Sequence, residues 1–166
     1  MKLETSRLSI RPLRESDWRA MKVIFTDFSA SPYAVYDHPM PSADEAVKAL
    51  TKWFADTNLF FAVFLQGSEE MMGYVCFHKV GEEYDLGYCF HSAFHGKGYA
   101  HESVTALLRL FAEEYGAAGF TAGTALDNKP SCALLEKLGF SLVSTETVSF
   151  DRVFSFPGGN FRLDLG

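Results

Sequence analysis

The sequence predicts an α/β protein built on a single mixed β-sheet. Some segments carry apolar residues at helical spacing, whereas others are short apolar or alternating runs that are typical of strands. Helical and strand-like segments succeed one another along the chain, giving about seven strands flanked by about four helices. The 166 residues can bury one substantial core but are too few for two ordinary domains, so we expect one domain over 1–166.

The first part of the chain is expected to fold as strand, helix, loop and helix. Alternating residues predict a strand over 8–13, and cap-like acidic and hydroxyl residues begin a helix over 15–27. Residues 29–41 contain three prolines and two tyrosines, which favours an irregular loop. Ser42 is then expected to cap a second helix over 42–56.

Three strand-like runs follow, over residues 60–65, 71–78 and 84–91. Short turns join them, so an antiparallel meander is the simplest arrangement. The segment 100–115 has apolar residues at positions i, i+4, i+7, i+8 and i+11, which predicts a helix with one buried face. A crossover through this helix should make the strands before and after it parallel.

The last part of the chain is expected to add a strand, a helix and a hairpin. The strand covers residues 120–125 and the helix covers 128–139. Two further strands, over 142–156 and 161–165, should pair in antiparallel fashion. The Pro-Gly-Gly sequence at 157–159 predicts the turn between them.

Composition and charge exclude several classes of partner. The chain has 15 basic and 21 acidic residues, a net charge of −6, and no basic stripe, so no nucleic acid is expected to bind. An acidic surface suits a cationic amine, although solubility alone also accounts for it. Charges interrupt the amino terminus every few residues, which argues against a signal peptide or membrane span. We therefore expect a cytoplasmic protein with no membrane partner.

The cysteines and histidines do not predict a metal centre. Cys76, Cys89 and Cys132 are odd in number, widely spaced and free of any CxxC pair, which indicates reduced thiols. The five histidines show neither HExxH nor another ligand spacing. We expect no metal.

The segment HGKGYA, residues 95–100, places two glycines immediately before the strongest predicted helix. A helix amino terminus has unpaired N–H groups and partial positive charge, and glycines let a phosphate approach them. A flexible entry into the helix is the alternative interpretation. The segment fits neither a dinucleotide-binding fingerprint, which needs a small residue where His101 stands, nor a phosphate loop, which needs different spacing.

Three blocks of sequence, taken together, resemble one enzyme superfamily. They are ETSRLSIRPLRESDW near the amino terminus, DLGYCFHSAFHGKGYAHESV in the middle, and LDNKPSCALLEKLGF toward the carboxyl terminus. In order and spacing they resemble the GCN5-related N-acetyltransferase (GNAT) superfamily, especially its ribosomal-protein amino-terminal acetyltransferases. The resemblance covers almost the whole chain and implies a GNAT fold with acetyl-CoA as cosubstrate.

The resemblance also implies which residues bind coenzyme A. The family signature, whose amides hold the pyrophosphate, maps onto His95, Gly98 and Ala100, with His95 in place of the usual Arg or Gln. Residues 88–90 resemble the strand end that pairs with the pantetheine arm, although a core strand explains the same run. Asn128 resembles an asparagine beside the cofactor and also suits helix capping. The full implied set is Tyr88, Cys89, Phe90, His95, Gly96, Lys97, Gly98, Tyr99, Ala100, Asn128 and Ser131.

For catalysis, the resemblance implies direct attack of a neutral amine on the acetyl thioester. Asp85 stands where relatives often carry Glu, so it is the candidate base, acting through water; a solvent-facing aspartate is the alternative. Many relatives use a helix Tyr to protonate the thiolate, but Leu135 occupies that position here. Ser131 is then the candidate acid.

The acceptor and the assembly are left open by the sequence. The acceptor implied by the resemblance is a primary amine, either a protein amino terminus or a small molecule, selected by the loop 32–41 and the late hairpin. An acyl-CoA-binding module with little or no activity is one alternative, and a structural domain with a glycine-rich turn is another. The oligomeric state is open between a monomer and a homodimer.

Overall fold

A computed structural model describes residues 1–150 and 152–165 of the chain as one mixed sheet with helices on both faces. The sheet has eight strands in the order β1-β2-β3-β4-β5-β6-β8-β7. The strands are β1 (Leu3–Glu4), β2 (Leu8–Pro12), β3 (Phe60–Leu65), β4 (Met71–Val80), β5 (Glu83–Phe90), β6 (Gly119–Ala125), β7 (Ser141–Val148) and β8 (Phe156–Asp164). The α-helices are α1 (Trp18–Ser29), α2 (Asp44–Asp56), α3 (Tyr99–Glu114) and α4 (Lys129–Lys137).

Short 3-10 turns precede or separate several of these elements. They are η1 (Glu15–Asp17), η2 (Ala34–Tyr36) and η3 (Ser92–Phe94). Within the described ranges, each helix lacks the combination of length and apolar character that a bilayer crossing requires.

The predicted strand directions are confirmed. β3, β4 and β5 pair in antiparallel fashion as a meander, and β7 pairs with β8 in antiparallel fashion. The crossover through α3 places β5 and β6 in parallel, with Tyr84 opposite Phe120 and Asp85 opposite Thr121. The mixed sheet and the four predicted helices are therefore correct.

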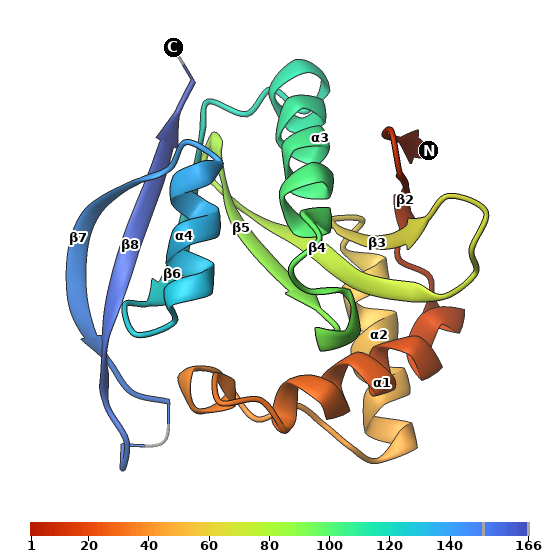
Figure 1. Ribbon diagram of the computed structural model, residues 1–166, viewed down its shortest axis with the longest axis horizontal. Coiled ribbons are helices and arrows are strands. Elements are labelled where there is room, and N and C mark those ends of the chain that lie inside the picture. Colours follow the sequence, from red (N-terminus) through yellow and green to blue (C-terminus); the bar gives the residue numbers. More distant parts are fainter. Residues whose placement is uncertain (151, 166) are drawn as a thin grey trace.

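The two faces of the sheet carry two apolar clusters. α3 and α4 lie across one face and α1 and α2 lie together on the other (Figure 1), because each helix buries one apolar side. Phe111 of α3 is fully buried at the centre of the larger cluster. Its ring stacks on Phe77 of β4 at a centroid distance of 4.0 Å and meets Tyr84 of β5 edge-on at 4.9 Å. These contacts fix α3 against the two strands that lead into the glycine turn.

The predicted turn at 157–159 is wrong, because these residues lie inside β8. β7 ends at Val148 and β8 begins at Phe156; residue 151, within the predicted strand 142–156, lies outside the described residues. The glycines serve close packing instead. A Cβ on Gly158 would lie 2.7 Å from Val148 Cγ2, and one on Gly159 would lie 2.8 Å from Leu126 Cδ2.

Two smaller predictions also differ from the structure. The cap of α2 is Ala43, so the helix begins two residues after Ser42, at Asp44. Residues 15–17 form η1 rather than the first turn of α1, because the Asp17 carboxylate accepts the main-chain N–H of Arg14 at 2.8 Å and closes a tighter turn. The two-residue strand β1 was too short to produce a sequence pattern.

Truncating Phe111 should destabilise the fold much more than truncating an exposed aromatic residue. We expect Phe111→Ala to lower the free energy of unfolding by about 3 to 5 kcal/mol, because it empties a site enclosed by other rings. The matched control is Trp53→Ala on α2, whose side chain is 64% exposed and whose loss should cost less than about 1 kcal/mol. Urea denaturation of both variants measures the difference; equal losses would contradict the described core.

Candidate functional site

The site begins where β5 and β6 part. The two parallel strands pair at Tyr84–Phe120 and Asp85–Thr121, close to their amino-terminal ends. β5 then continues to Phe90 and β6 to Ala125 with no further pairing between them among the described residues. The predicted pantetheine segment, residues 88–90, pairs with β4 on one side but not with β6 on the other, so this open edge can accept an extended ligand as an additional strand.

The turn that follows β5 presents main-chain donors. Gly96 and Gly98 adopt left-handed conformations, with φ of 76° and 80°, which side chains disfavour. Gly98 is the N-cap of α3, and its carbonyl accepts the N–H of Glu102 at 3.0 Å. In the part of the chain that the structure describes, the N–H groups of residues 96–101 have no hydrogen-bond acceptor. Free main-chain donors of this kind are suited to binding an anion.

His95 is held by the strand that it follows. Its Nε2 lies 2.7 Å from the carbonyl oxygen of Phe90, so this nitrogen carries the proton and donates it. This hydrogen bond ties the side chain of His95, the first residue of the family signature, to Phe90, the last residue of β5. The predicted donation from His95 to a phosphate would have to break this bond or come from a doubly protonated ring, since Nδ1 is an acceptor while only Nε2 carries a proton.

The predicted residues on α4 meet β5 across the opening. The hydroxyl of Ser131 hydrogen-bonds the hydroxyl of Tyr88 at 2.9 Å. Asn128 caps α4, its Oδ1 accepting the N–H of Ser131 at 3.3 Å. Burial raises the pKa of Tyr88, and the hydrogen bond with Ser131 opposes that shift. Leu135 is buried in the larger apolar cluster, as its side chain requires.

Asp85 lies at the point where β5 and β6 part, on the face opposite Tyr88. Side chains alternate along a strand, so residues 85 and 89 share the face of α1 and α2, whereas Tyr88 packs against the cluster under α3. The Asp85 carboxylate accepts a hydrogen bond from the Thr121 hydroxyl at 2.8 Å. Burial raises the pKa of Asp85, and the Thr121 bond and the nearby His78 only partly oppose it. A carboxyl group in this state suits proton acceptance better than an ordinary surface aspartate.

The three cysteines are free thiols of low reactivity. Burial raises the pKa of Cys76 and of Cys89 to about 12, with a smaller contribution from nearby carboxylates. Burial also raises the pKa of Cys132. These shifts disfavour the thiolate, which is the nucleophilic form of each cysteine, at neutral pH.

The two segments expected to select the acceptor lie against each other. Tyr36 of η2 meets Phe156 at the start of β8 with ring centroids 5.0 Å apart. His38 lies 4.2 Å from Phe150, measured between ring centroids. A cavity of about 270 Å³ adjoins the same loop and is lined by Phe28, Ser29, Ala34, Val35, His38, Pro39 and Met40. One aromatic wall thus joins the loop after α1 to the β7–β8 connection.

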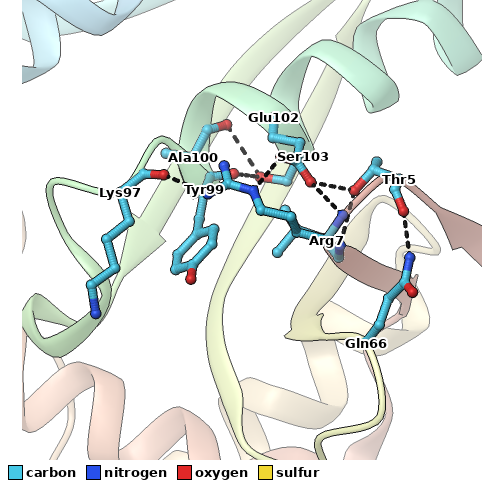
Figure 2. A network of polar contacts seen from close by, with 9 residues as sticks. Thr5, Arg7, Gln66, Lys97, Tyr99, Ala100, Glu102 and Ser103 are labelled. Atoms are coloured by element: carbon cyan, nitrogen blue, oxygen red, sulfur yellow. Dashed lines mark hydrogen bonds and ion pairs between the residues drawn. The ribbon is translucent and has the colours of Figure 1, made fainter.

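Two sets of contacts to the glycine turn were missed by the sequence predictions. On one side, Asp27 at the end of α1 accepts the Ser92 N–H at 2.9 Å and the Ser92 hydroxyl at 2.5 Å. Burial would raise the pKa of Asp27, but these bonds and the nearby histidines lower it. On the other side, Arg7 pairs with Glu102 of α3 (Figure 2). The ETSRL block contained Arg7, but its spacing alone gave no indication of this partner.

Comparison with known proteins identifies the family. The profile of the acetyltransferase (GNAT) domain matches residues 7–141. An uncharacterised N-acetyltransferase, YnaD of Bacillus subtilis (strain 168), is 28% identical over 141 residues, which cover 84% of this chain and 82% of the relative. A GNAT-family acetyltransferase from Bacillus anthracis superposes with a TM-score of 0.83 at 25% identity, covering 99% of this chain and 98% of the other.

A further solved structure with the same fold carries a ligand. The ribosomal L7/L12 alpha-N-protein acetyltransferase RimL, solved in complex with coenzyme A, superposes with a TM-score of 0.88 at 18% identity. The match covers 99% of this chain and 98% of that chain. At this identity the likeness concerns the fold.

The elevated pKa of Asp85 can be measured directly. Carbon-13 NMR titration of the side-chain carboxyl should give a value above the ordinary 3.8. Thr121→Val removes a donor to the ionised form, so it should raise the pKa of Asp85 further. Asp44 is the internal control, since its pKa is lowered by a hydrogen bond from Lys22 and should not change in the variant. A value at or below 3.8 would contradict the described environment.

The same shift has a consequence for stability. Between the unfolded value of 3.8 and the raised folded value, the folded protein holds this proton while the unfolded chain has lost it. The contribution of Asp85 to stability therefore falls as pH rises through that window. Asp85→Asn should remove this component from the pH dependence of the unfolding free energy.

Proposed function

Because the chain belongs to the GNAT acetyltransferase family and is an acetyl-CoA-dependent acetyltransferase, we propose that its acceptor is a primary amine. The amine is either the α-amine of a protein amino terminus or that of a small molecule. The observation that carries the cofactor assignment is the row of unpaired N–H groups over residues 96–101, directly after the part of β5 that does not pair with β6. RimL, which shares the fold, is an alpha-N-protein acetyltransferase of a ribosomal protein, and this supports the α-amine.

Each part of acetyl-CoA has a fitting partner in the described residues. The diphosphate would accept hydrogen bonds from the turn amides and lie at the positive end of α3. The pantetheine arm would lie beside residues 88–90, between β5 and β6. The acetyl group, at the end of this arm, would then lie between the strands near Asp85 and Ser131.

The reaction needs two proton transfers on opposite sides of the thioester. The amine nitrogen bonds to the acetyl carbon, the carbon–sulfur bond breaks, the amine loses a proton, and the thiolate gains one. Asp85 lies on the face of α1 and α2, where it accepts the Thr121 hydrogen bond. It would receive the amine proton through water. An α-amine with a pKa of about 7.7 to 8.0 needs only such a weak base.

Protonation of the thiolate is assigned to the hydroxyl pair on the other face. Ser131 would donate to sulfur, and Tyr88 would replace that proton through the 2.9 Å bond between the hydroxyls. This pair would replace the helix hydroxyl that Leu135 lacks. The high pKa of all three thiols supports direct transfer rather than an acetyl-cysteine intermediate.

The thiols and the net charge support a compartment and a class of acceptor. Three free thiols suit the reducing cytoplasm, where we place the reaction. The acidic surface, with a net charge of −6, suits a cationic acceptor.

Two measurements test the proposed function. Acetyl-CoA should raise the melting temperature in a saturable manner, because a ligand that binds the native state stabilises it. Release of free thiol should then depend on the amine when a panel of α-amine peptides, lysine-like amines and small polyamines is supplied. Thermal stabilisation without thiol release from any amine would instead indicate a binding module, and no stabilisation would contradict cofactor binding.

The hydroxyl pair makes a separate prediction about turnover. Ser131→Ala should lower kcat by about 100-fold, the lower end of the usual range for a general acid, while changing the apparent KM for acetyl-CoA much less. Tyr88→Phe should lower kcat in the same direction by a smaller factor, since Ser131 remains. The control is Ser103→Ala on α3, whose hydroxyl bonds only helix carbonyls among the described residues. Unchanged turnover in Ser131→Ala would remove the pair from the mechanism.

A further inference from the structure

The segment before β2 lies against the turn that binds the diphosphate in the proposed function. Thr5 and Arg7 are far from Lys97 and Glu102 in sequence. Figure 2 nevertheless shows the side chains of Thr5 and Arg7 directed at the first turn of α3 and the residue before it. The contacts cross between the edge of the sheet and the helix that follows β5. These contacts connect the amino-terminal ETSRL segment with the glycine turn, residues 95–100.

Arg7 makes four contacts with this turn. Its Nε donates to Glu102 Oε1 at 2.8 Å, and its main-chain N–H donates to Glu102 Oε2 at 3.1 Å. One terminal nitrogen donates to the carbonyl oxygen of Lys97 at 2.9 Å. The guanidinium also lies over the ring of Tyr99, 4.6 Å from its centroid. The planar fork of arginine allows these contacts to form together.

Glu102 is also held by Thr5, so its position does not depend on Arg7 alone. The hydroxyl of Thr5 donates to Glu102 Oε2 at 2.6 Å, and the Gln66 side chain donates to the Thr5 carbonyl. Burial would raise the pKa of Glu102, but the hydrogen bonds from Thr5 and Arg7 outweigh it and lower the pKa. The carboxylate is therefore charged and held by donors from two residues.

The bond to Lys97 controls a donor of the anion site. The Lys97 carbonyl and the Gly98 N–H belong to one peptide unit, and no cis peptide bond occurs among the described residues. In a planar trans peptide these two groups point in opposite directions. Holding the carbonyl toward Arg7 therefore turns the Gly98 N–H away from Arg7. The other terminal nitrogen of Arg7 lies 3.4 Å from the place of a Gly98 Cβ, so the guanidinium packs directly against this residue.

We propose that Arg7 is a positioning residue for coenzyme A: through Lys97 and Glu102 it holds the glycine turn in the conformation that directs its amides at the diphosphate. This inference rests on the proposed function. Arg7 acts on the turn and not on the reacting atoms, so its loss should weaken cofactor binding and leave the chemical step intact. It also places a cation beside the turn, where His95 replaces the usual Arg or Gln.

The chain supplies a matched control in Arg11. This residue also pairs with a carboxylate, donating to both oxygens of Asp17 at 2.9 and 2.8 Å, and lies over an aromatic ring, Phe64, at 4.8 Å. Its partners lie in η1 and β3, away from the turn. Arg7→Ala and Arg11→Ala thus each remove an ion pair and a cation–π contact, one just before β2 and the other near its end.

Calorimetric titration with coenzyme A, together with steady-state kinetics, tests the inference. Arg7→Ala should weaken coenzyme A binding by roughly tenfold or more, the usual effect of one hydrogen bond to a charged group, and raise the KM for acetyl-CoA equally. The kcat at saturating acetyl-CoA should stay within about twofold of the wild type. Arg11→Ala should change the dissociation constant by less than about twofold. Arg7→Lys keeps the charge but not the fork, so it should recover only part of the affinity.

Each outcome decides between the inference and its alternatives. Equal effects of Arg7→Ala and Arg11→Ala on coenzyme A binding would show a general loss of stability and overturn the inference. So would a fall in kcat with unchanged KM. If Arg7→Ala does not fold, Arg7→Lys and Glu102→Gln carry the same test, and unchanged affinity in both overturns it. Failure of the wild type to bind coenzyme A would instead contradict the proposed function itself.

Discussion

The site depends on how little of β5 pairs with β6. Two residue pairs join the strands, and both lie close to the beginning of each strand. Beyond them, β5 leads through the glycine turn into α3 and β6 leads into α4. Two helix amino termini, capped by Gly98 and Asn128, are therefore brought to the same open end of the sheet. Full pairing of the strands would occupy the main-chain groups of residues 88–90 and close the space that an extended ligand requires.

The opening also separates the two halves of the proposed chemistry. The side chain of Tyr88 points toward the layer of α3 and α4, where it meets Ser131 of α4. The side chain of Asp85 points toward the layer of α1 and α2. Strand alternation enforces this division, because neighbouring residues of β5 must point to opposite faces. A thioester lying between the strands would have a proton donor on one side and a proton acceptor on the other. The aromatic wall of Tyr36 and Phe156 is separate from Asp85 and joins the segment after α1 to the start of β8.

The parts of the site that sequence could predict are those with local causes. The helix over 100–115 and the turn before it follow from apolar spacing and from two glycines, and both are found. The turn at 157–159 failed because glycine has two uses, and here Gly158 and Gly159 allow close packing between strands. The bond between Tyr88 and Ser131 spans 43 positions and that between Arg7 and Glu102 spans 95. Such contacts require the sheet order, which no local pattern contains.

Recognition through main-chain donors makes the turn tolerant of the residue at position 95 but dependent on neighbouring residues that hold its conformation. Because amides rather than side chains would hold the diphosphate, His95 can bond the Phe90 carbonyl without removing a donor from residues 96–101. Left-handed glycines, however, have many accessible conformations, and ordering them costs free energy. That cost is reduced when neighbouring groups already hold the turn. Asp27 holds it through Ser92 and Arg7 holds it through Lys97, so the short motif is shaped by residues that lie outside it.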